Sequence, residues 1–478
     1  MKRRDFMKYT AAGVLAPALT GPGCGGRPSR PNIVIFLSDD MSWAQPGYNG
    51  GTTVPTPNID RIAAGGVKLT QFYVQPVCSP TRACLMTGRY AWKNGMEERP
   101  TAQSQHGMLS DERTMAEMLK DAGYATWMVG KWHLGEWQHH HLPNQRGFDH
   151  HYGHYSALID YFTHTRNGVL DWHRNGEPVI EEGYSTFLFA KEAEKLIAGH
   201  DGRRPFFLYM PFSAVHGPHQ APEEYVKKYR DKGIAFPEQK AQLDCMDIAI
   251  GRVLEALKRK GIERETLIIF LNDNGGYRPG GPNGPYRGGK GAYYEGGIRV
   301  PCCLQWPGRI TPGTSTNEML HVIDLYPTIG NLTGADLEQK LPLDGRDAWA
   351  AIAQGAASPR KEMAHSLEVL RRDDWKLIEE GASYYGWKSP DLKLYNIADD
   401  PSETRNLAAQ NPEIVKELRE RLAYHRRFVR KPEELSTIPG YPPVVYGERE
   451  NGIWADELRE KVNELKKEDV TWLRLQKR

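Results

Sequence analysis

The sequence predicts an α/β fold with a large, mixed but mostly parallel sheet, helices on both of its faces, and a smaller C-terminal α+β subdomain. Short apolar runs bounded by polar or turn-forming residues are typical of strands buried on both faces, and they occur at 33–37, 125–129, 206–210 and 267–271. Strands that alternate with helices indicate βαβ units, and helical patterns separate these runs at 114–122, 185–198 and 241–258.

The third observation is a change of pattern after residue 345. Short segments at 374–378 and 393–397 are typical of antiparallel strands, and a helical pattern follows at 412–428. A proline-rich stretch (432–443) and a charged amphipathic tail from Ala455 complete the chain. We therefore expect three parts, namely an N-terminal leader, a large α/β domain and a C-terminal subdomain, with the bounds 1–30, 31–345 and 346–478.

Composition excludes several classes of protein. The chain has 478 residues, of which 39% are hydrophobic and 26% charged, so it can bury a large core and is not disordered throughout. A net charge of +2 lacks the basic excess of a nucleic-acid-binding protein. Six cysteines in a chain of this length exclude a disulfide-rich scaffold.

The N-terminus has the features of a twin-arginine export signal. Arg3 and Arg4 precede Phe6 and Lys8, and a modest apolar stretch follows at 9–19. This stretch is too short, and too interrupted by glycine and proline, to span a bilayer. We expect the export machinery to deliver the protein to the periplasm or the extracellular space. A lipid anchor at Cys24 is an alternative, although the residues before Cys24 match a lipidation motif poorly.

Paired polar residues follow two of the predicted strands. Asp39-Asp40 follows the run 33–37 after one serine, and Asp273-Asn274 follows the run 267–271 after one asparagine. Ligands bind beyond the carboxyl ends of strands in such sheets, and adjacent carboxylates repel each other unless a cation or a proton lies between them. Either pair alone fits a helix cap. The two together favour a hard divalent cation such as Ca²⁺ or Mg²⁺.

Cys78 stands in the segment Val-Cys-Ser-Pro-Thr-Arg. Because proline is tolerated in the first turn of a helix but not in its interior, Pro80 predicts that a helix begins here, with Cys78 near its N-terminus. That position favours a thiolate or a bound anion. Arg82, four residues further on, would lie on the same helix face. A buried structural cysteine is the alternative interpretation.

Further basic residues and histidines follow the predicted strands. Lys131 and His133 alternate after the run 125–129, so that an extended backbone would point both side chains to one side. His216 follows the run 206–210. Together with an acidic metal site and a nucleophile, these side chains suit a displacement reaction at an anionic tetrahedral centre.

Lys290 lies in a glycine-rich loop that approaches the spacing of a nucleotide-binding motif. Gly284 and Gly289-Lys290 have the required separation, but Gly291 stands where that motif needs Ser or Thr, and no apolar strand leads directly into the loop. We therefore interpret Lys290 as a cation held over an anion. A histidine-rich stretch from His139 to His164 matches no standard zinc motif, and we interpret it as a binding wall or a solvated surface.

The segment 78–82 resembles the Cys-x-Pro-x-Arg signature of the formylglycine-dependent sulfatases, a type I, arylsulfatase-like family of the alkaline-phosphatase superfamily. The resemblance continues to Arg89 and covers nearly the whole chain after residue 30. It is specific for the family but not for a substrate. The further matching segments are 31–33, 39–40, 57–60, 130–135, 273–275, 295–301, 324–328, 394–395, 400–401 and 406–407.

The resemblance implies a nucleophile and a metal site. A maturation enzyme would oxidise Cys78 to formylglycine (3-oxoalanine), and the hydrate of this aldehyde would attack the sulfate ester. The ligands of one Ca²⁺ ion would be Asp39, Asp40, Asp273, Asn274 and the modified Cys78.

The resemblance also implies roles for five further side chains. Arg82 would stabilise the hydrate, while Lys131 and Lys290 would bind the sulfate. His133 would be the base that helps to release sulfate and restore the aldehyde. His216 would lie near the leaving-group oxygen as a candidate general acid.

Two other functions remain open. A phosphodiesterase or phosphonate monoester hydrolase of the same superfamily is the closest, and a non-catalytic glycan-binding protein on the same fold is the other. A sulfated carbohydrate is the substrate that we expect, because the chain carries an export signal and a stretch rich in histidine and tryptophan (139–172) that would face sugars.

Overall fold

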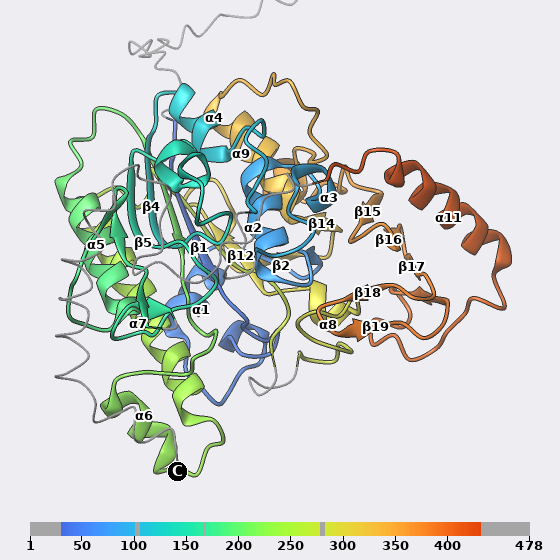
Figure 1. Ribbon diagram of the computed structural model, residues 1–478, viewed down its shortest axis with the longest axis horizontal. Helices are drawn as coiled ribbons and strands as arrows, with labels where there is room; N and C mark the ends of the chain where they lie inside the picture. The colour runs from blue at the N-terminus through green and yellow to red at the C-terminus, as the bar shows by residue number, and fades with distance from the viewer. Residues whose placement is uncertain (1–29, 101–105, 167, 278–282, 432–478) are drawn as a thin grey trace, which may run out of the picture.

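The structure is a computed structural model that describes residues 30–100, 106–166, 168–277 and 283–431 (Figure 1). The predicted export signal with Cys24, the proline-rich stretch and the charged tail lie outside the described residues, apart from Arg30 at the edge of the signal. Within the described part, ten strands form one large sheet. In spatial order they are β13 (Thr314–Thr316), β2 (Val67–Leu69), β12 (Cys302–Gln305), β11 (Thr266–Asn272), β1 (Asn32–Ser38), β10 (Phe206–Pro211), β4 (Ala125–Lys131), β5 (His150–His154), β8 (His173–Arg174) and β9 (Glu177–Pro178).

The four apolar runs form the centre of this sheet. Strand β1 pairs in parallel with β11 on one side and with β10 on the other, and β10 continues in parallel to β4. Every residue of these four strands is buried, because helices cover both faces. Strands β12 and β8 add antiparallel pairs towards the edges. The predicted mixed, mostly parallel sheet is therefore confirmed.

The two faces of the sheet have separate cores. Alternate residues of β1 point to opposite faces, so Ile33 and Ile35 pack in one core while Val34 and Phe36 pack in the other. Helices α2 (Cys78–Thr87), α4 (Met115–Asp121) and α9 (Leu325–Thr333) cover the first face. Helices α1 (Pro57–Ala64), α5 (Ser185–Gly199) and α7 (Pro237–Lys260) cover the second (Figure 1).

The C-terminal part contains a second sheet. Four antiparallel strands are described there, in the order β15 (Glu362–Ala364), β16 (Val369–Arg372), β17 (Trp375–Ile378) and β20 (Lys393–Asn396). Helix α11 (Pro412–Arg426) packs against β16 and β17. The expected antiparallel strands and helix are thus present. The hairpin of β18 (Ser383–Tyr384) and β19 (Trp387–Lys388) extends from this sheet.

The remaining elements are short. Two further two-stranded pairs are β3 (Phe72–Tyr73) with β14 (Leu320–His321), and β6 (Thr165–Arg166) with β7 (Val169–Leu170). The other helices are α3 (Ala91–Asn94), α6 (Glu223–Arg230), α8 (Glu295–Ile298) and α10 (Trp349–Ala353). None of the helices in the described ranges is long and apolar enough to cross a membrane.

Candidate active site

The polar pairs that follow β1 and β11 lie next to each other. The two strands pair from Asn32↔Thr266 to Ser38↔Asn272, so their carboxyl ends are level. Asn272, which the sequence analysis did not single out, holds the two turns together. Its Nδ2 donates to the Met41 carbonyl at 2.7 Å, and its Oδ1 accepts from the Ser38 hydroxyl at 2.8 Å. Asn272 therefore positions the acidic pairs without being one of the predicted ligands.

The predicted metal ligands form one buried group. Asn274 Nδ2 donates to Asp40 Oδ1 at 2.8 Å, and the Asp40 backbone N–H donates to Asp273 Oδ1 at 3.3 Å. Asp39 Oδ1 and Asn274 Oδ1 are buried and have no hydrogen-bond partner among the described residues. Buried polar atoms are normally satisfied, and carboxylate and amide oxygens are the ligands that Ca²⁺ prefers. The residues present therefore fit the predicted cation.

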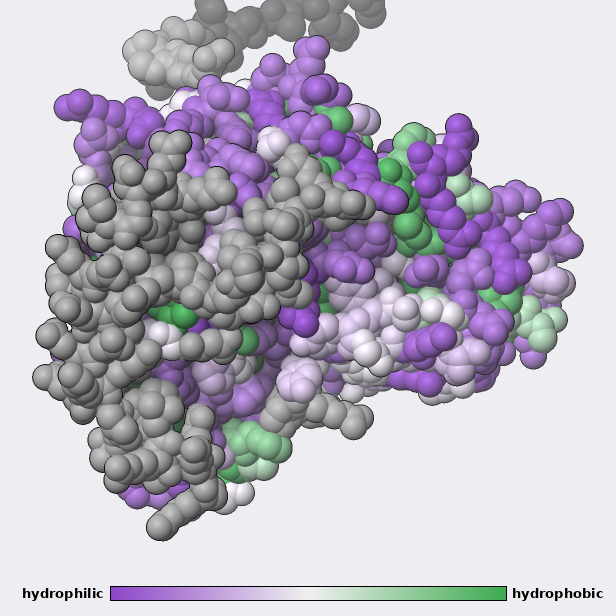
Figure 2. Space-filling model, in the orientation of Figure 1, coloured by the Kyte–Doolittle hydropathy of each residue, from purple (hydrophilic) through white to green (hydrophobic). Residues whose placement is uncertain are grey.

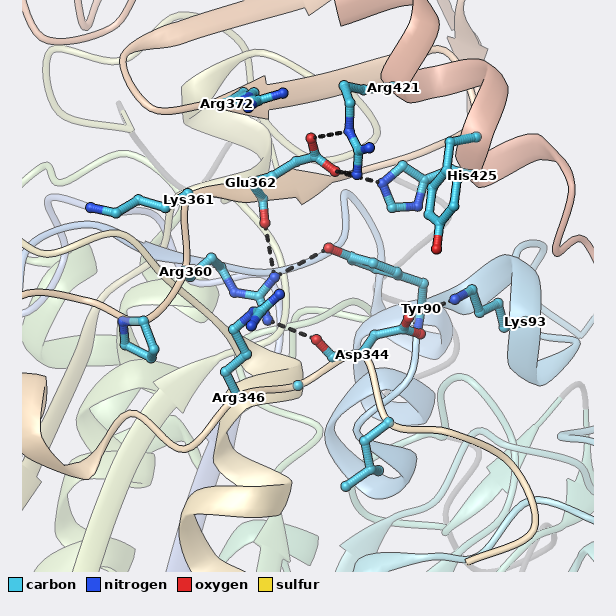
Figure 3. Close-up of a pocket in the computed structure, with 14 residues that line it drawn as sticks. Tyr90, Lys93, Asp344, Arg346, Arg360, Lys361, Glu362, Arg372, Arg421 and His425 are labelled. Carbon is cyan, nitrogen blue, oxygen red and sulfur yellow. Dashed lines mark hydrogen bonds and ion pairs between the residues drawn. The ribbon is translucent and has the colours of Figure 1, made fainter.

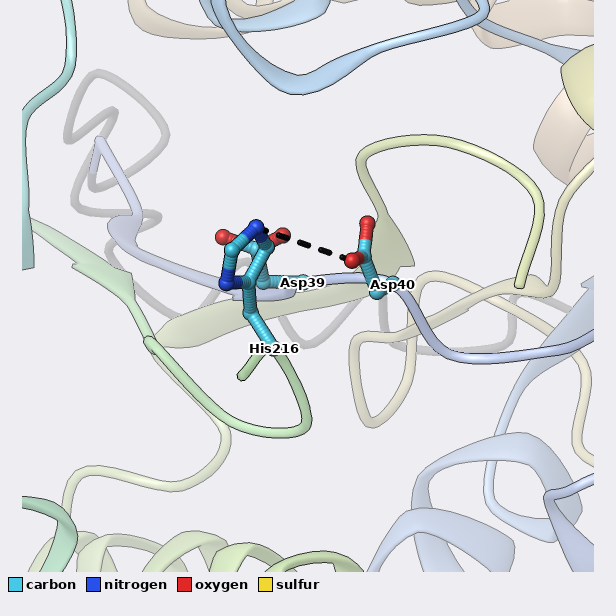
Figure 4. A group of neighbouring side chains, drawn as sticks. All are labelled: Asp39, Asp40 and His216. Atoms are coloured by element: carbon cyan, nitrogen blue, oxygen red, sulfur yellow. Dashed lines mark ion pairs between the residues drawn. The ribbon is translucent and has the colours of Figure 1, made fainter. Parts of the chain in front are cut away.

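His216 joins these carboxylates. Single ligand atoms of Asp39, Asp40 and His216 lie within 4.8 Å of one another (Figure 4). The His216 Nε2 lies 3.7 Å from Asp40 Oδ2, and its Nδ1 lies 2.6 Å from the Gly217 carbonyl oxygen. Burial, together with the charge of Lys290, lowers the pKa of His216 to about 4. The imidazole is therefore neutral near pH 7.

Three cations surround the same carboxylates. The Arg82 guanidinium lies 2.8 Å from Asp273 and 3.1 Å from Asp39. Lys131 contacts Asp39 at 2.5 Å, and Lys290 contacts Asp40 at 2.7 Å. Gly130 directly precedes Lys131 and has a φ of +139°, and a Cβ there would lie 1.9 Å from the Pro211 carbonyl oxygen. Only glycine therefore lets β4 lie this close to the end of β10.

The surroundings shift the pKa values of Asp39 and Asp273 in opposite directions. Burial acts to raise the pKa of Asp39, but Lys131 and other nearby cations outweigh it and hold this pKa below its ordinary range. Burial and the charge of Asp39 raise the pKa of Asp273 above its ordinary range. Two ionised carboxylates this close repel each other, and a divalent cation between them would relieve that repulsion.

Cys78 is the first residue of α2, as Pro80 predicted. The thiol is buried, and its Sγ lies 3.2 Å from His133 Nδ1. Burial raises the pKa of the unmodified thiol, although Lys131 and Lys290 act against this. For the unmodified thiol, desolvation therefore outweighs the nearby positive charges.

His133 reaches the site by a backbone turn that the alternation with Lys131 did not predict. Strand β4 ends at Lys131, and His133 has a φ of 58°, so the expected extended backbone is wrong. This turn brings the imidazole to Cys78. Burial, followed by Lys131 and Arg82, lowers the pKa of His133 well below its ordinary value. Its Nε2 is buried and has no hydrogen-bond partner in the described part of the chain.

The histidine-rich stretch is not the sugar-facing wall that we expected. His139 and His140 are exposed, but His141, His151, His154 and His164 are buried. Trp172 is fully buried and stacks on His164 with ring centroids 4.2 Å apart. These side chains form part of the core around β5 and β8, because the covering loops and α5 exclude solvent from them.

An exposed tyrosine that the sequence analysis missed lies beside Lys290. Tyr385, in the turn between β18 and β19, is 48% exposed and has a φ of 46°. The centroid of its ring is 5.9 Å from Lys290 Nζ and 4.8 Å from the Arg99 guanidinium carbon. A non-glycine residue in the left-handed region at a site rim is a signal for function, but it is visible only in the structure.

All six predicted reactive side chains therefore meet at the carboxyl ends of the central strands; they are Cys78, Arg82, Lys131, His133, His216 and Lys290. Converging cations beside a carboxylate group and a candidate nucleophile are typical of enzymes that act on anionic esters. A family model described as "Sulfatase" matches residues 31–335, and one described as "N-sulphoglucosamine sulphohydrolase, C-terminal" matches 289–427. The chain belongs to the sulfatase family.

Individual relatives agree with this assignment. The chain is 34% identical over 452 residues to arylsulfatase J of Mus musculus, and the aligned part covers 83% of this chain and 75% of the relative. It is 34% identical over 373 residues to N-acetylgalactosamine-6-sulfatase of Rattus norvegicus, covering 72% and 70%. The crystal structure of Ps i-CgsB in complex with k-i-k-neocarrahexaose is similar, with a TM-score of 0.78, 30% identity, and coverage of 85% and 94%. The predicted family, fold class and enzyme class are confirmed.

Proposed function

We propose that this protein hydrolyses sulfate monoesters of a carbohydrate, with formylglycine formed from Cys78 and one Ca²⁺ bound by Asp39, Asp40, Asp273, Asn274 and the modified residue. The observation that carries this proposal is the convergence of Cys78 with four oxygen-bearing side chains, two of which have unpartnered oxygens. When present, the hydrated aldehyde supplies the attacking oxygen and Ca²⁺ neutralises negative charge.

The basic side chains bind and orient the ester. Lys131 and Lys290 contact Asp39 and Asp40 from different segments, so both ammonium groups face the point where the carboxylates converge. A divalent cation on those carboxylates would free the two lysines to bind sulfate oxygens. Arg82 is fully buried between Asp39 and Asp273, which suits a fixed positive charge beside residue 78.

Two histidines move protons in this proposal. His133 is neutral and lies against residue 78, so its imidazole can accept the proton whose loss expels sulfate and restores the aldehyde. His216 lies beside Asp40 and is the candidate acid for the leaving-group oxygen. Its lowered pKa requires that it takes up a proton in the substrate complex, where the negative charge of sulfate favours the imidazolium form.

The carbohydrate part of the proposal rests on the relatives and on the site rim. Two of the similar proteins carry a sugar in their names or bound ligand. Tyr385 offers an exposed aromatic ring beside Lys290, and aromatic rings commonly bind the apolar faces of sugars. Arg99 lies over the same ring and would pair with a second acidic group of the substrate.

Export and the division into domains stay predictions. Residues 1–30 would direct the chain through the twin-arginine machinery to the periplasm or beyond, with a lipid anchor at Cys24 as the alternative. Residues 31–345 would form the catalytic domain and residues 346–478 the C-terminal subdomain. The hairpin that carries Tyr385 supports a contribution of the second part to the substrate site.

Mass spectrometry of the peptide that contains residue 78 tests the nucleophile. We expect the mass of an aldehyde in place of the thiol in protein produced together with a maturation enzyme, and activity that rises with the modified fraction. Wild-type activity from fully unmodified Cys78 would contradict the proposal. Rates on an aryl sulfate and an aryl phosphodiester separate a sulfatase from a phosphodiesterase, and we expect the sulfate to react faster.

A screen of defined sulfated saccharides tests the substrate class. We expect Tyr385→Ala to raise KM for the best saccharide roughly fivefold, because about 1 kcal/mol of stacking is lost, while the rate on a small aryl sulfate changes little. Phe236→Ala is the matched control, because Phe236 is also an exposed aromatic residue with a positive φ, at the start of α7. Turnover of aryl sulfates with no turnover of any sulfated saccharide would refute the carbohydrate assignment.

A further inference from the structure

A second pocket lies apart from the strand-end site, where α3, the loop after residue 342, β15, β16 and α11 meet (Figure 3). Its volume is about 650 Å³, which is in the range of sites for small ligands. Basic side chains dominate its lining, namely Lys93, Arg346, Arg360, Lys361, Arg372 and Arg421. The lining contains two carboxylates, Asp344 and Glu362.

Four of the basic side chains already have carboxylate partners. Lys93 pairs with Asp344 at 2.5 Å, and Arg421 pairs with Glu362 at 2.8 Å. Arg372 pairs with Glu417, which lies outside the pocket. Arg360 pairs with the buried Asp324. These pairs account for both carboxylates of the lining and leave the other basic residues uncompensated.

Arg346 and Lys361 are the uncompensated cations. Both side chains belong to exposed residues, and within the described ranges neither makes an ion pair with a carboxylate. Figure 3 shows them on two different segments that border the pocket. The pocket therefore carries an excess positive charge at its rim, which favours an anionic ligand.

Arg360 connects the segments that line the pocket. Arg360 donates to the Tyr90 hydroxyl at 3.2 Å and to the backbone carbonyls of Glu362 and Asp344 at 3.0 and 3.1 Å. Because its guanidinium is also paired with Asp324, Arg360 joins the segments that carry Tyr90, Asp324 and Asp344 to its own. A preformed site loses less conformational entropy when a ligand binds.

An aromatic ring stands at the same pocket. Tyr424 on α11 is 43% exposed, and the Arg421 guanidinium carbon lies 4.9 Å from the centre of its ring. The face seen in Figure 2 carries both hydrophilic and hydrophobic residues on the C-terminal elements. The lining therefore combines exposed cations with an exposed tyrosine, and these match the two chemical features of a sulfated sugar, its anionic groups and its apolar ring face.

We propose that this pocket is a second, non-catalytic binding site for a sulfated saccharide, in which Arg346 and Lys361 bind the sulfate groups and Tyr424 packs against a sugar ring. The site goes beyond the proposed catalytic function and rests on its own residues. It would hold a sulfated chain on the enzyme while another part of the chain occupies the strand-end site.

Native electrophoresis through gels that contain carrageenan or heparin tests the site. The full-length protein with Cys78→Ala serves as the background, because it binds without turnover. We expect sulfated polysaccharide to retard this protein, and Arg346→Gln with Lys361→Gln to weaken binding roughly tenfold, since two exposed charge contacts are lost. Tyr424→Ala is expected to weaken it about fivefold.

The matched control removes two exposed cations elsewhere, by Lys232→Gln with Arg264→Gln, and should keep the affinity of the background. In protein with Cys78 intact, the Arg346/Lys361 variant should keep its rate on a small aryl sulfate within about twofold. A loss of that rate would show that the pocket serves the active site instead. The proposal would be overturned if sulfated polysaccharide retarded the pocket variant as much as it retards the background protein. It would also be overturned if desulfated carrageenan retarded the background protein as much as the sulfated form does. The gel outcomes are measured on Cys78→Ala protein, so failure of the aldehyde test at Cys78 would leave them unchanged and the two proposals fail separately.

Discussion

The molecule contains two buried clusters of charge that differ in how completely they are paired. The strand-end cluster consists of Asp39, Asp40, Arg82, Lys131, Asp273 and Asn274. The interface cluster joins α8 to the C-terminal sheet and consists of Tyr73, Glu295, Lys376 and Glu403. All the acids and cations named in both clusters are buried, so burial alone does not distinguish them.

In the interface cluster, each carboxylate oxygen has a hydrogen-bond or ion-pair partner, although the contact of Lys376 with Glu403 Oε1 is an ion pair without a hydrogen bond. Lys376 Nζ lies 3.0 Å from Glu295 Oε1 and 2.8 Å from Glu403 Oε1. The Tyr73 hydroxyl donates to Glu295 Oε2 at 2.7 Å, and the Glu295 backbone N–H donates to Glu403 Oε2 at 2.6 Å. In the strand-end cluster, by contrast, Asp39 Oδ1 and Asn274 Oδ1 are buried without a partner among the described residues. Complete pairing is typical of a structural role, and missing partners indicate where a ligand binds.

The largest expected effect is on activity at the strand-end cluster. Cys78→Ala should lower kcat on an aryl sulfate at least about a thousandfold, because it removes the nucleophile. Cys84→Ala is the matched control, since Cys84 is buried on the same helix and has no contact with His133. Steady-state kinetics on both variants measures the difference. Equal activities would remove Cys78 from the mechanism.

Breaking the interface cluster should change stability. Lys376→Met leaves Glu295 and Glu403 buried without their shared cation and should lower the free energy of unfolding by about 3–5 kcal/mol. Arg61→Met breaks an exposed pair with Glu255 and should cost far less, because solvent screens the pair. Denaturation by urea measures both values. Similar losses in the two variants would show that the interface cluster is not the structural element that its pairing indicates.

Ca²⁺ should stabilise the folded protein by binding at the strand-end cluster and not at the interface cluster. Adding Ca²⁺ at a hundredfold excess over its Kd to chelator-treated protein should increase the free energy of unfolding by about 2.7 kcal/mol and raise Tm. Asp39→Asn should largely abolish this increase, whereas Asp344→Asn, outside the cluster, should keep it. Thermal denaturation with and without Ca²⁺ provides a readout that is independent of activity. An increase that survives in the Asp39 variant would place the ion elsewhere.

The partly exposed cluster of Glu362, Arg421 and His425 should show the smallest effect on stability, and this effect depends on pH. Although burial acts to raise the pKa of Glu362, hydrogen bonds from His425 and Arg421 lower it to about 2. A lowered folded-state pKa stabilises the protein above the unfolded value of about 4.5, and this contribution is lost as the pH falls towards 2. Glu362→Gln should therefore cost about 1 kcal/mol at pH 7 and almost nothing at pH 2. Urea midpoints across this range measure the change, and a cost independent of pH would contradict it.

The sequence predicted most of the candidate site because its residues follow strands with strong apolar patterns. Asp39-Asp40 and Asp273-Asn274 were expected to meet because parallel strands end at one edge of the sheet, and they do. The start of α2 followed from Pro80. The turn at His133 was missed because nothing local distinguishes it from extended backbone.

Other features depend on distant parts of the chain. From the sequence, the histidines before residue 165 were interpreted as a binding or solvated surface. Loops and α5 bury most of them, and composition does not indicate this burial. Tyr385 lies beside Lys290 across almost a hundred residues of sequence, and Arg346 and Lys361 line one pocket only because several segments enclose it. Long-range proximity of this kind has no periodic signal in the sequence.

The amino-acid sequence by itself determined the α/β architecture and the family and pointed to the candidate reactive side chains, because apolar periodicity and short motifs act over a few residues. The tertiary structure alone decided which polar atoms remain without partners, which histidines are neutral, and where a second group of cations lies uncompensated. These properties depend on burial and on charges brought together from distant segments, since desolvation and Coulomb interactions act through space rather than along the chain.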